Sequence, residues 1–122
     1  MRIYTVARPM FWSALAVAFV MAVLPQDAAL QLLPSDKLQH MLAFFTMAVL
    51  GRLAYPTVPV LTIGAGLAGY GALIELVQLI PALNRSGDWA DLVADLVALT
   101  VGLSLSRYLQ RRRWEKAKAA AS

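Results

Sequence analysis

Four long apolar stretches, separated by turn-forming residues, dominate the pattern of this chain. They cover residues 8–24, 38–55, 58–80 and 89–108. A helix needs about 17 to 25 largely apolar residues to cross a hydrocarbon core of about 30 Å. Each break contains proline, and the third also contains Asn84 and Gly87, which stop helices and form turns. The pattern therefore predicts an all-α fold, a four-transmembrane-helix bundle with short connections.

The composition agrees with a membrane protein and excludes other classes. Of 122 residues, 60% are hydrophobic and only 11 basic and seven acidic residues are present, too few to cover a soluble domain of this size. The chain is too apolar for a disordered protein, lacks the glycine repeat of collagen and has no cysteine for a disulfide scaffold. We expect a single membrane domain over residues 1–122.

The basic residues predict the orientation of the helices. With the N- and C-termini both cytoplasmic, nine of the 11 Lys and Arg residues lie inside and only Lys37 and Arg85 lie outside. Residues 109–122 then form a basic cytoplasmic tail that meets anionic lipid headgroups, so we expect no nucleic-acid partner. No small-x-small cleavage pattern follows Leu24, which favours a permanent span over a cleaved signal peptide.

The third apolar stretch is rich in small residues. It contains Gly64, Gly66, Gly69 and Gly71. Small residues allow neighbouring helices to approach closely, so this stretch is predicted to be the packing centre of the bundle. The same small-residue faces could also support a homo-oligomer, although glycine and alanine are common in membrane helices in general.

Polar residues gather where three of the stretches begin or end. Ionisable groups in an apolar span cost about 3 kcal/mol each on insertion scales and need partners or a polar cavity. Antiparallel connectivity brings the start of the second stretch, the end of the third and the start of the fourth to the same outer face. The candidate binding residues are Asp36, Lys37, His40, Glu75, Gln78, Arg85, Asp88, Asp91 and Asp95, called the polar cluster below.

The polar cluster also carries a resemblance to a known family. The motifs are Ser35-Asp36-Lys37-x-x-His40, Glu75-x-x-Gln78, Pro81 with Arg85, and Asp91-x-x-x-Asp95. Over residues 35–105 the chain resembles the VanZ-like family of small bacterial integral membrane proteins. Asp95 stands where the family usually has Asn, and Ala98 where it usually has Gly. The resemblance implies a multi-pass protein of the bacterial cytoplasmic (inner) membrane, associated with resistance to the glycopeptide antibiotic teicoplanin, without an assigned molecular activity.

Four interpretations of the polar cluster stay open at this stage. It binds a lipid headgroup, with an anionic or undecaprenyl-type lipid as the partner; it only locks helix packing through interhelical hydrogen bonds; it performs acid–base or metal-assisted chemistry on a membrane lipid; or it belongs to an ion pathway. His40 is the only histidine and no His or Cys pairs occur, so no metal or other cofactor is expected and an enzyme is the less favoured reading. The inner halves of the stretches lack a relay of ionisable residues, which disfavours the ion pathway.

Overall fold

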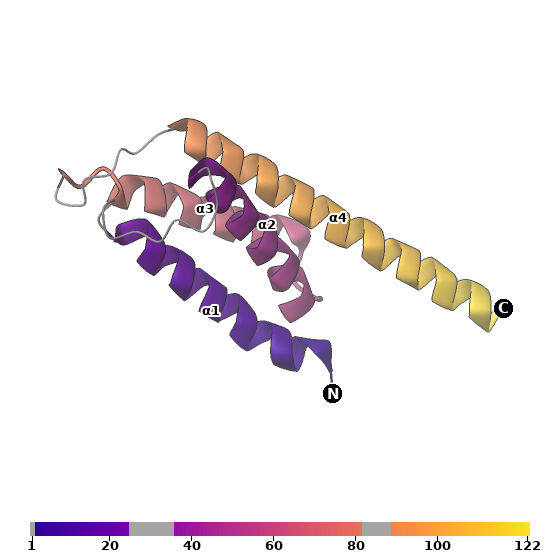
Figure 1. Cartoon of the computed structure of the whole chain (residues 1–122). Helices are drawn as coiled ribbons and strands as arrows, with labels where there is room; N and C mark the ends of the chain where they lie inside the picture. Colours follow the sequence, from indigo (N-terminus) through magenta and orange to yellow (C-terminus); the bar gives the residue numbers. More distant parts are fainter. Residues whose placement is uncertain (1, 25–35, 82–88) are drawn as a thin grey trace.

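The computed structural model describes residues 2–24, 36–81 and 89–122 and contains four helices in these ranges (Figure 1). They are α1 (Ile3–Val23), α2 (Asp36–Ala54), α3 (Val60–Val77) and α4 (Trp89–Ala121). The prediction of an all-α fold is confirmed. Helices α1, α3 and α4 are long and apolar enough to cross a membrane, which indicates a multi-pass membrane protein.

Helix α2 is not among the described helices that are apolar enough to cross a membrane, and several of its 19 residues are polar. It makes the most extensive contacts in the fold, with α1 on one side and α4 on the other, and it also contacts α3. Its residues Phe44, Met47 and Ala48 are almost completely buried. Protein rather than lipid therefore surrounds much of α2, which explains how this helix tolerates a less apolar sequence. The prediction that the third stretch is the packing centre is wrong, since α2 has that role.

Close helix approach depends on particular glycines in α3 and α4. A Cβ atom at Gly102 of α4 would lie 2.9 Å from Cβ of Ala48 and 3.0 Å from the backbone oxygen of Phe45, both in α2. A Cβ at Gly71 of α3 would lie 3.1 Å from Cζ of Phe44. By contrast, Gly66 and Gly69 of α3 would have no neighbour within 4 Å in the described part of the chain. Only some of the small residues predicted to pack therefore do so.

Helix α4 continues far beyond the predicted end at residue 108. It runs for 33 residues to Ala121, about 50 Å at 1.5 Å per residue, and its last turns project away from the bundle (Figure 1). The predicted helix end at residue 108 is wrong, because the basic residues of 109–121 continue α4 as a helix. After Gly102 the chain has neither glycine nor proline, and residues 109–121 are mostly Arg, Lys, Ala, Glu, Leu and Gln, which favour helix.

Apart from the start of α1, the other helix ends lie within about three residues of the predicted positions. Helix α1 begins at Ile3, five residues before the predicted start, and includes Pro9. Helix α3 is preceded by Pro59 at its N-cap and ends at Val77. Beyond Val77 the hydrogen bonds span three residues instead of four, since Leu79 N–H donates to Leu76 O at 3.2 Å. The beginnings of α2 and α4 and the end of α3 lie at one end of the molecule, and both termini lie toward the other (Figure 1). This arrangement places the described members of the predicted polar cluster toward one end of the molecule.

Candidate functional site

An ion pair between two helices lies at the accessible part of the polar cluster. Lys37 Nζ in the first turn of α2 lies 3.7 Å from Oδ1 of Asp91 in the first turn of α4. The side chain of Lys37 is 46% exposed and that of Asp91 is 19% exposed. Exposed pairs of this kind contribute at most about 1 kcal/mol to stability. The pair therefore does little to hold the helices together, and the ammonium group remains accessible from outside.

Three members of the cluster lie in the interior instead. Asp95 of α4 is completely buried at 0% exposure, and Glu75 at the end of α3 is also buried. Gln78, just after α3, is buried as well, and its Nε2 donates a hydrogen bond of 3.2 Å to the backbone oxygen of Ala22 in α1. Buried carboxyl groups need polar partners, and both Glu75 and Asp95 have at least one interaction partner in the structure.

The register of the helices brings His40 to the depth of these two acids. Helices α2 and α3 are antiparallel, and Phe44 is in contact range of a Cβ at Gly71. One helical turn from this contact toward the cluster end leads from Phe44 to His40 in α2 and from Gly71 to Glu75 in α3. His40 and Glu75 are therefore level along the two helices. His40 lies on the same face of α2 as Phe44, because residues four apart in a helix share a face.

The register between α2 and α4 places Asp95 at the same depth as His40. Helices α2 and α4 are parallel, with Lys37 beside Asp91 and Ala48 beside Gly102, so one offset holds along both contacts. This offset places Asp95 within one residue of the level of His40. One imidazole and two carboxyl groups therefore share one layer, from three different helices, beneath the Lys37–Asp91 pair.

Several predicted members of the cluster cannot be placed in this layer. Arg85 and Asp88 lie outside the described residues, and Asp36 begins α2 without a described side chain. Within residues 2–24, 36–81 and 89–122, no group of three or more His, Asp or Glu side chains is arranged to hold a metal ion. Of the nine predicted residues, the structure thus pairs Lys37 with Asp91 and bonds Gln78 to α1, and the helix registers put His40, Glu75 and Asp95 at similar depth on three helices.

This arrangement divides the cluster into an accessible rim and a buried layer. A headgroup phosphate or hydroxyl can reach the rim, where an ammonium and a carboxylate offer a donor and an acceptor. The buried layer contains groups that can exchange protons and form interhelical hydrogen bonds. Direct contact of a ligand with Glu75 or Asp95 requires the helices to separate, because both side chains are buried.

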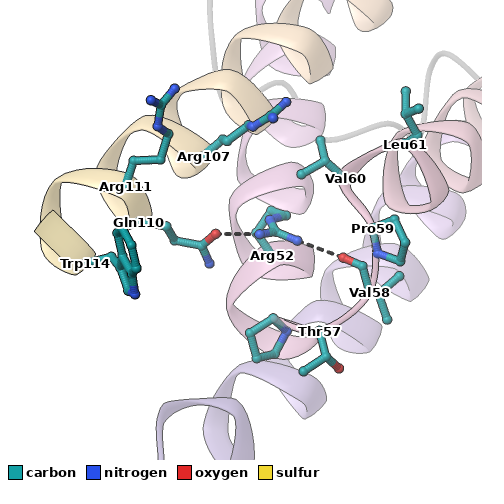
Figure 2. Close-up of a pocket in the computed structure, with 11 residues that line it drawn as sticks. Arg52, Thr57, Val58, Pro59, Val60, Leu61, Arg107, Gln110, Arg111 and Trp114 are labelled. Carbon is teal, nitrogen blue, oxygen red and sulfur yellow. Dashed lines mark hydrogen bonds between the residues drawn. The ribbon is translucent and has the colours of Figure 1, made fainter. Parts of the chain in front are cut away.

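A second polar centre, missed by the sequence analysis, lies at the opposite end of α2. Arg52, in the last turn of α2, is only 7% exposed. Its Nη1 donates to the backbone oxygen of Val58 at 2.8 Å, and its Nη2 donates to Oε1 of Gln110 in α4 (Figure 2). From the sequence, Arg52 is predicted only as one of the nine basic residues on the cytoplasmic side. The signal that could have found this centre is an arginine inside an apolar stretch, which needs buried partners.

Aromatic residues and Arg8 join α1 to the same end of α2. Arg8 Nε donates to the backbone oxygen of Ala54 at 3.0 Å, and its guanidinium carbon lies 4.8 Å from the ring centroid of Tyr55. Trp12 Nε1 donates to the hydroxyl of Tyr55 at 2.8 Å. Cation–π and hydrogen-bond contacts therefore hold the end of α2 against α1.

Comparisons with protein families, curated proteins and solved structures find no match to this chain. The resemblance to the VanZ-like family consequently rests on the motifs of the polar cluster.

Proposed function

We propose that this chain is a VanZ-like protein of the bacterial cytoplasmic membrane that binds a lipid headgroup at the outer face through its polar cluster. In this proposal all four helices span the membrane and both termini are cytoplasmic. The proposal draws support from the excess of Lys and Arg at the end that carries the termini. It also draws support from the convergence of charged and polar side chains at the other end.

The observation that carries the proposal is the Lys37–Asp91 pair above a buried acidic layer. The separation of 3.7 Å is long for a charge-assisted hydrogen bond. A Lys ammonium has three donors, so it can keep Asp91 as a neighbour while it binds a phosphate oxygen. The nearby carboxylate of Asp91 in turn accepts from a hydroxyl or an ammonium of the same headgroup.

The chemistry of this rim fits lipids that combine phosphate with hydroxyl or amino groups. Anionic phospholipids and undecaprenyl-type lipids, on which envelope-directed antibiotics act, belong to this class. Binding at the outer leaflet would alter access of a glycopeptide to its lipid-linked target. In this proposal Glu75 and Asp95 do not contact the headgroup but hold His40 and the rim in position from below.

The test is teicoplanin susceptibility in a bacterium whose outer leaflet the drug can reach. The strains express the intact chain, Lys37→Gln, Glu75→Gln or the control Lys116→Gln, and immunoblots quantify each protein in the membrane. Lys116 is an exposed residue of α4 far from the cluster, so its substitution removes the same charge without touching the rim. We expect protection by the intact chain and by Lys116→Gln, and loss of protection with Lys37→Gln and Glu75→Gln.

A direct measurement accompanies the susceptibility test. Lipids that copurify with each variant in mild detergent are identified by mass spectrometry, and Lys37→Gln should retain less phosphate-bearing lipid than Lys116→Gln. Equal retention and equal protection by both lysine variants would overturn headgroup binding at the rim. Lack of protection by the intact chain, with lipid retention unchanged by Lys37→Gln, would overturn it as well.

A purely structural role of the cluster is the second candidate, and one contact favours it. The bond from Gln78 to Ala22 joins α3 to α1 inside the protein, and Asp95 is completely buried. Buried polar groups of this kind fix helix register in membrane bundles, with about 0.6 to 2 kcal/mol per interhelical hydrogen bond. Under this alternative Glu75→Gln changes stability, whereas Lys37→Gln changes neither stability, protection nor lipid retention.

A further inference from the structure

A basic pocket lies at the end of the bundle opposite the polar cluster. It has a volume of about 570 Å³ and lies between the end of α2, the residues that lead into α3, and the second half of α4. Figure 2 shows Arg52 at its centre, with Arg107, Arg111 and Trp114 of α4 on one side and residues 58–61 on the other. The pocket is separate from the proposed headgroup site at the rim.

Three arginines, and no acidic residue, line this pocket within the described part of the chain. Among its described lining residues are Arg52, Arg107 and Arg111, and none of them is Asp or Glu. Like charges that line one pocket repel one another, and a bound anion compensates this repulsion. Solvent does not fully screen the charge of Arg52, because this side chain is more than nine-tenths buried.

The buried arginine also has an unused donor. Two donors of its guanidinium bind Val58 O and Gln110 Oε1, but its Nε has no hydrogen-bond acceptor within residues 2–24, 36–81 and 89–122. A buried donor without a partner costs about 1 to 3 kcal/mol. The same bond to Gln110 occupies the amide oxygen, which leaves the amide nitrogen of Gln110 as a further donor for an anion.

The start of α3 adds a third source of positive potential. Residues 56–61 line the pocket, and α3 begins at Val60 after Pro59, with no side-chain hydrogen bond to cap it. The first amides of a helix have no partner within the helix, and the helix dipole is positive at this end. Helix N-termini with these properties bind phosphate.

We propose that this pocket binds the phosphate group of an anionic phospholipid in the leaflet opposite the polar cluster. The guanidinium groups of Arg107 and Arg111 contact the phosphate oxygens, which arginine binds in a bidentate manner. Arg52 supplies buried positive charge behind them. Trp114 takes the interfacial position that tryptophan prefers beside lipid headgroups.

Two observations favour a lipid over a soluble phosphate as the source of this group. Leu61, which lines the pocket, is 86% exposed, so an apolar surface adjoins the basic one. A second, almost entirely apolar pocket of about 380 Å³ between α1, α2 and α3 shares Val58 with the basic pocket. Charge beside apolar surface matches an amphiphile with a phosphate and an acyl chain.

The test compares two double variants with the same change in charge. Arg107→Gln/Arg111→Gln removes the two exposed arginines of the pocket, whereas Arg112→Gln/Arg113→Gln removes two exposed arginines of α4 that do not line it. The full chain in detergent is titrated with dioleoyl phosphatidylglycerol, or with dioleoyl phosphatidylcholine, and bound lipid is counted by native mass spectrometry. Circular dichroism confirms equal helix content.

We expect the intact chain to prefer phosphatidylglycerol, and the Arg107/Arg111 double variant to lose affinity about tenfold or more, since charge-assisted hydrogen bonds are the strong ones. The Arg112/Arg113 double variant should lose less than about threefold, the effect of distant screened charges. Equal losses in both double variants, or equal binding of the two lipids, overturn the proposal. A competition experiment with glycerol phosphate distinguishes a lipid phosphate from a soluble phosphate as the ligand. If glycerol phosphate displaces phosphatidylglycerol at equal concentration, the proposal of a lipid ligand is overturned, and retention of the lipid supports it.

Discussion

Gln78 donates a hydrogen bond of 3.2 Å to the backbone oxygen of Ala22, so the end of α3 is tied to the last turns of α1. Both residues are buried. Helices α1 and α3 otherwise share few contacts. This bond, together with the hydrogen bond of 2.5 Å that the Tyr70 hydroxyl donates to the backbone oxygen of Leu15, joins α3 to α1.

Gln78→Leu should destabilise the protein by about 1 kcal/mol, because the carbonyl of Ala22 loses a buried donor while the volume of the side chain is retained. The measurement is unfolding in mixed micelles with increasing dodecyl sulfate, followed by circular dichroism. Thr100→Ala is the control, since its hydroxyl bonds only to Leu96 O within α4 and is exposed. Equal stability of Gln78→Leu and the intact chain would show that the bond does not hold α1.

Gly102 marks the closest approach of α4 to α2. A Cβ there would meet Cβ of Ala48 and the backbone oxygen of Phe45, and neither atom can turn away. Gly102→Ala should therefore cost about 1 to 3 kcal/mol, as overpacking does in close-packed interiors. Ala48→Gly in the same chain should recover part of this loss, because it removes one of the two clashing atoms.

Gly66→Ala provides the matched control for this prediction. A Cβ at Gly66 has open space around it, so the substitution should be neutral or stabilise by up to about 1 kcal/mol through helix propensity. The same micelle unfolding experiment compares the two alanine variants. If Gly66→Ala proves as harmful as Gly102→Ala, the helices pack differently from the arrangement described above.

The helices could be predicted from the sequence because apolar length and proline positions are local signals. The end of α4 could not, since the run from Arg111 to Lys118 indicates charge but does not distinguish a helical extension from an extended tail. The importance of α2 was missed for a similar reason: its polar residues make it less apolar, whereas its central position depends on contacts such as Ala48 with Gly102 that are distant in sequence.

The approach of Lys37 to Asp91 was predictable in outline because antiparallel helices bring their alternate ends together. The depth of each side chain was not, because burial of Glu75 and Asp95 depends on register, which a one-residue shift would change. Arg52 is the clearest case. Its partner Gln110 lies 58 residues away, so no local pattern distinguishes this buried arginine from a cytoplasmic surface charge.

Arg52→Lys should destabilise the protein by about 2 kcal/mol although the charge is kept. Lysine has no planar fork and cannot bond to Val58 O and Gln110 Oε1 together, and hydrogen bonds to charged groups contribute about 1.5 to 3 kcal/mol. Arg107→Lys is the control, because Arg107 is exposed and should change stability by less than about 0.5 kcal/mol. Similar unfolding midpoints for both lysine variants would show that the fork is not stabilising.

Single cysteines can test the number of spans and the orientation, since the natural chain contains no cysteine. The positions are Ile3, Leu79 and Ser122, which lie at or near helix ends, and Ile3 and Leu79 are exposed. Intact cells expressing each variant are treated with a membrane-impermeant maleimide before and after permeabilisation. With four spans and the excess of Lys and Arg inside, Leu79→Cys should react in intact cells, and Ile3→Cys and Ser122→Cys only after permeabilisation.

The three positions distinguish the alternative topologies of the chain. The topologies differ first in whether α2 crosses the membrane, because α2 is not among the helices apolar enough to do so. If α2 lies against the bundle without crossing, an odd number of spans remains, and Ile3→Cys and Ser122→Cys must react on opposite sides. If all four helices cross in the inverted orientation, Ile3→Cys and Ser122→Cys react in intact cells and Leu79→Cys does not. The inverted result would place the Lys37–Asp91 rim in the cytoplasm, where it could not meet a lipid of the outer leaflet.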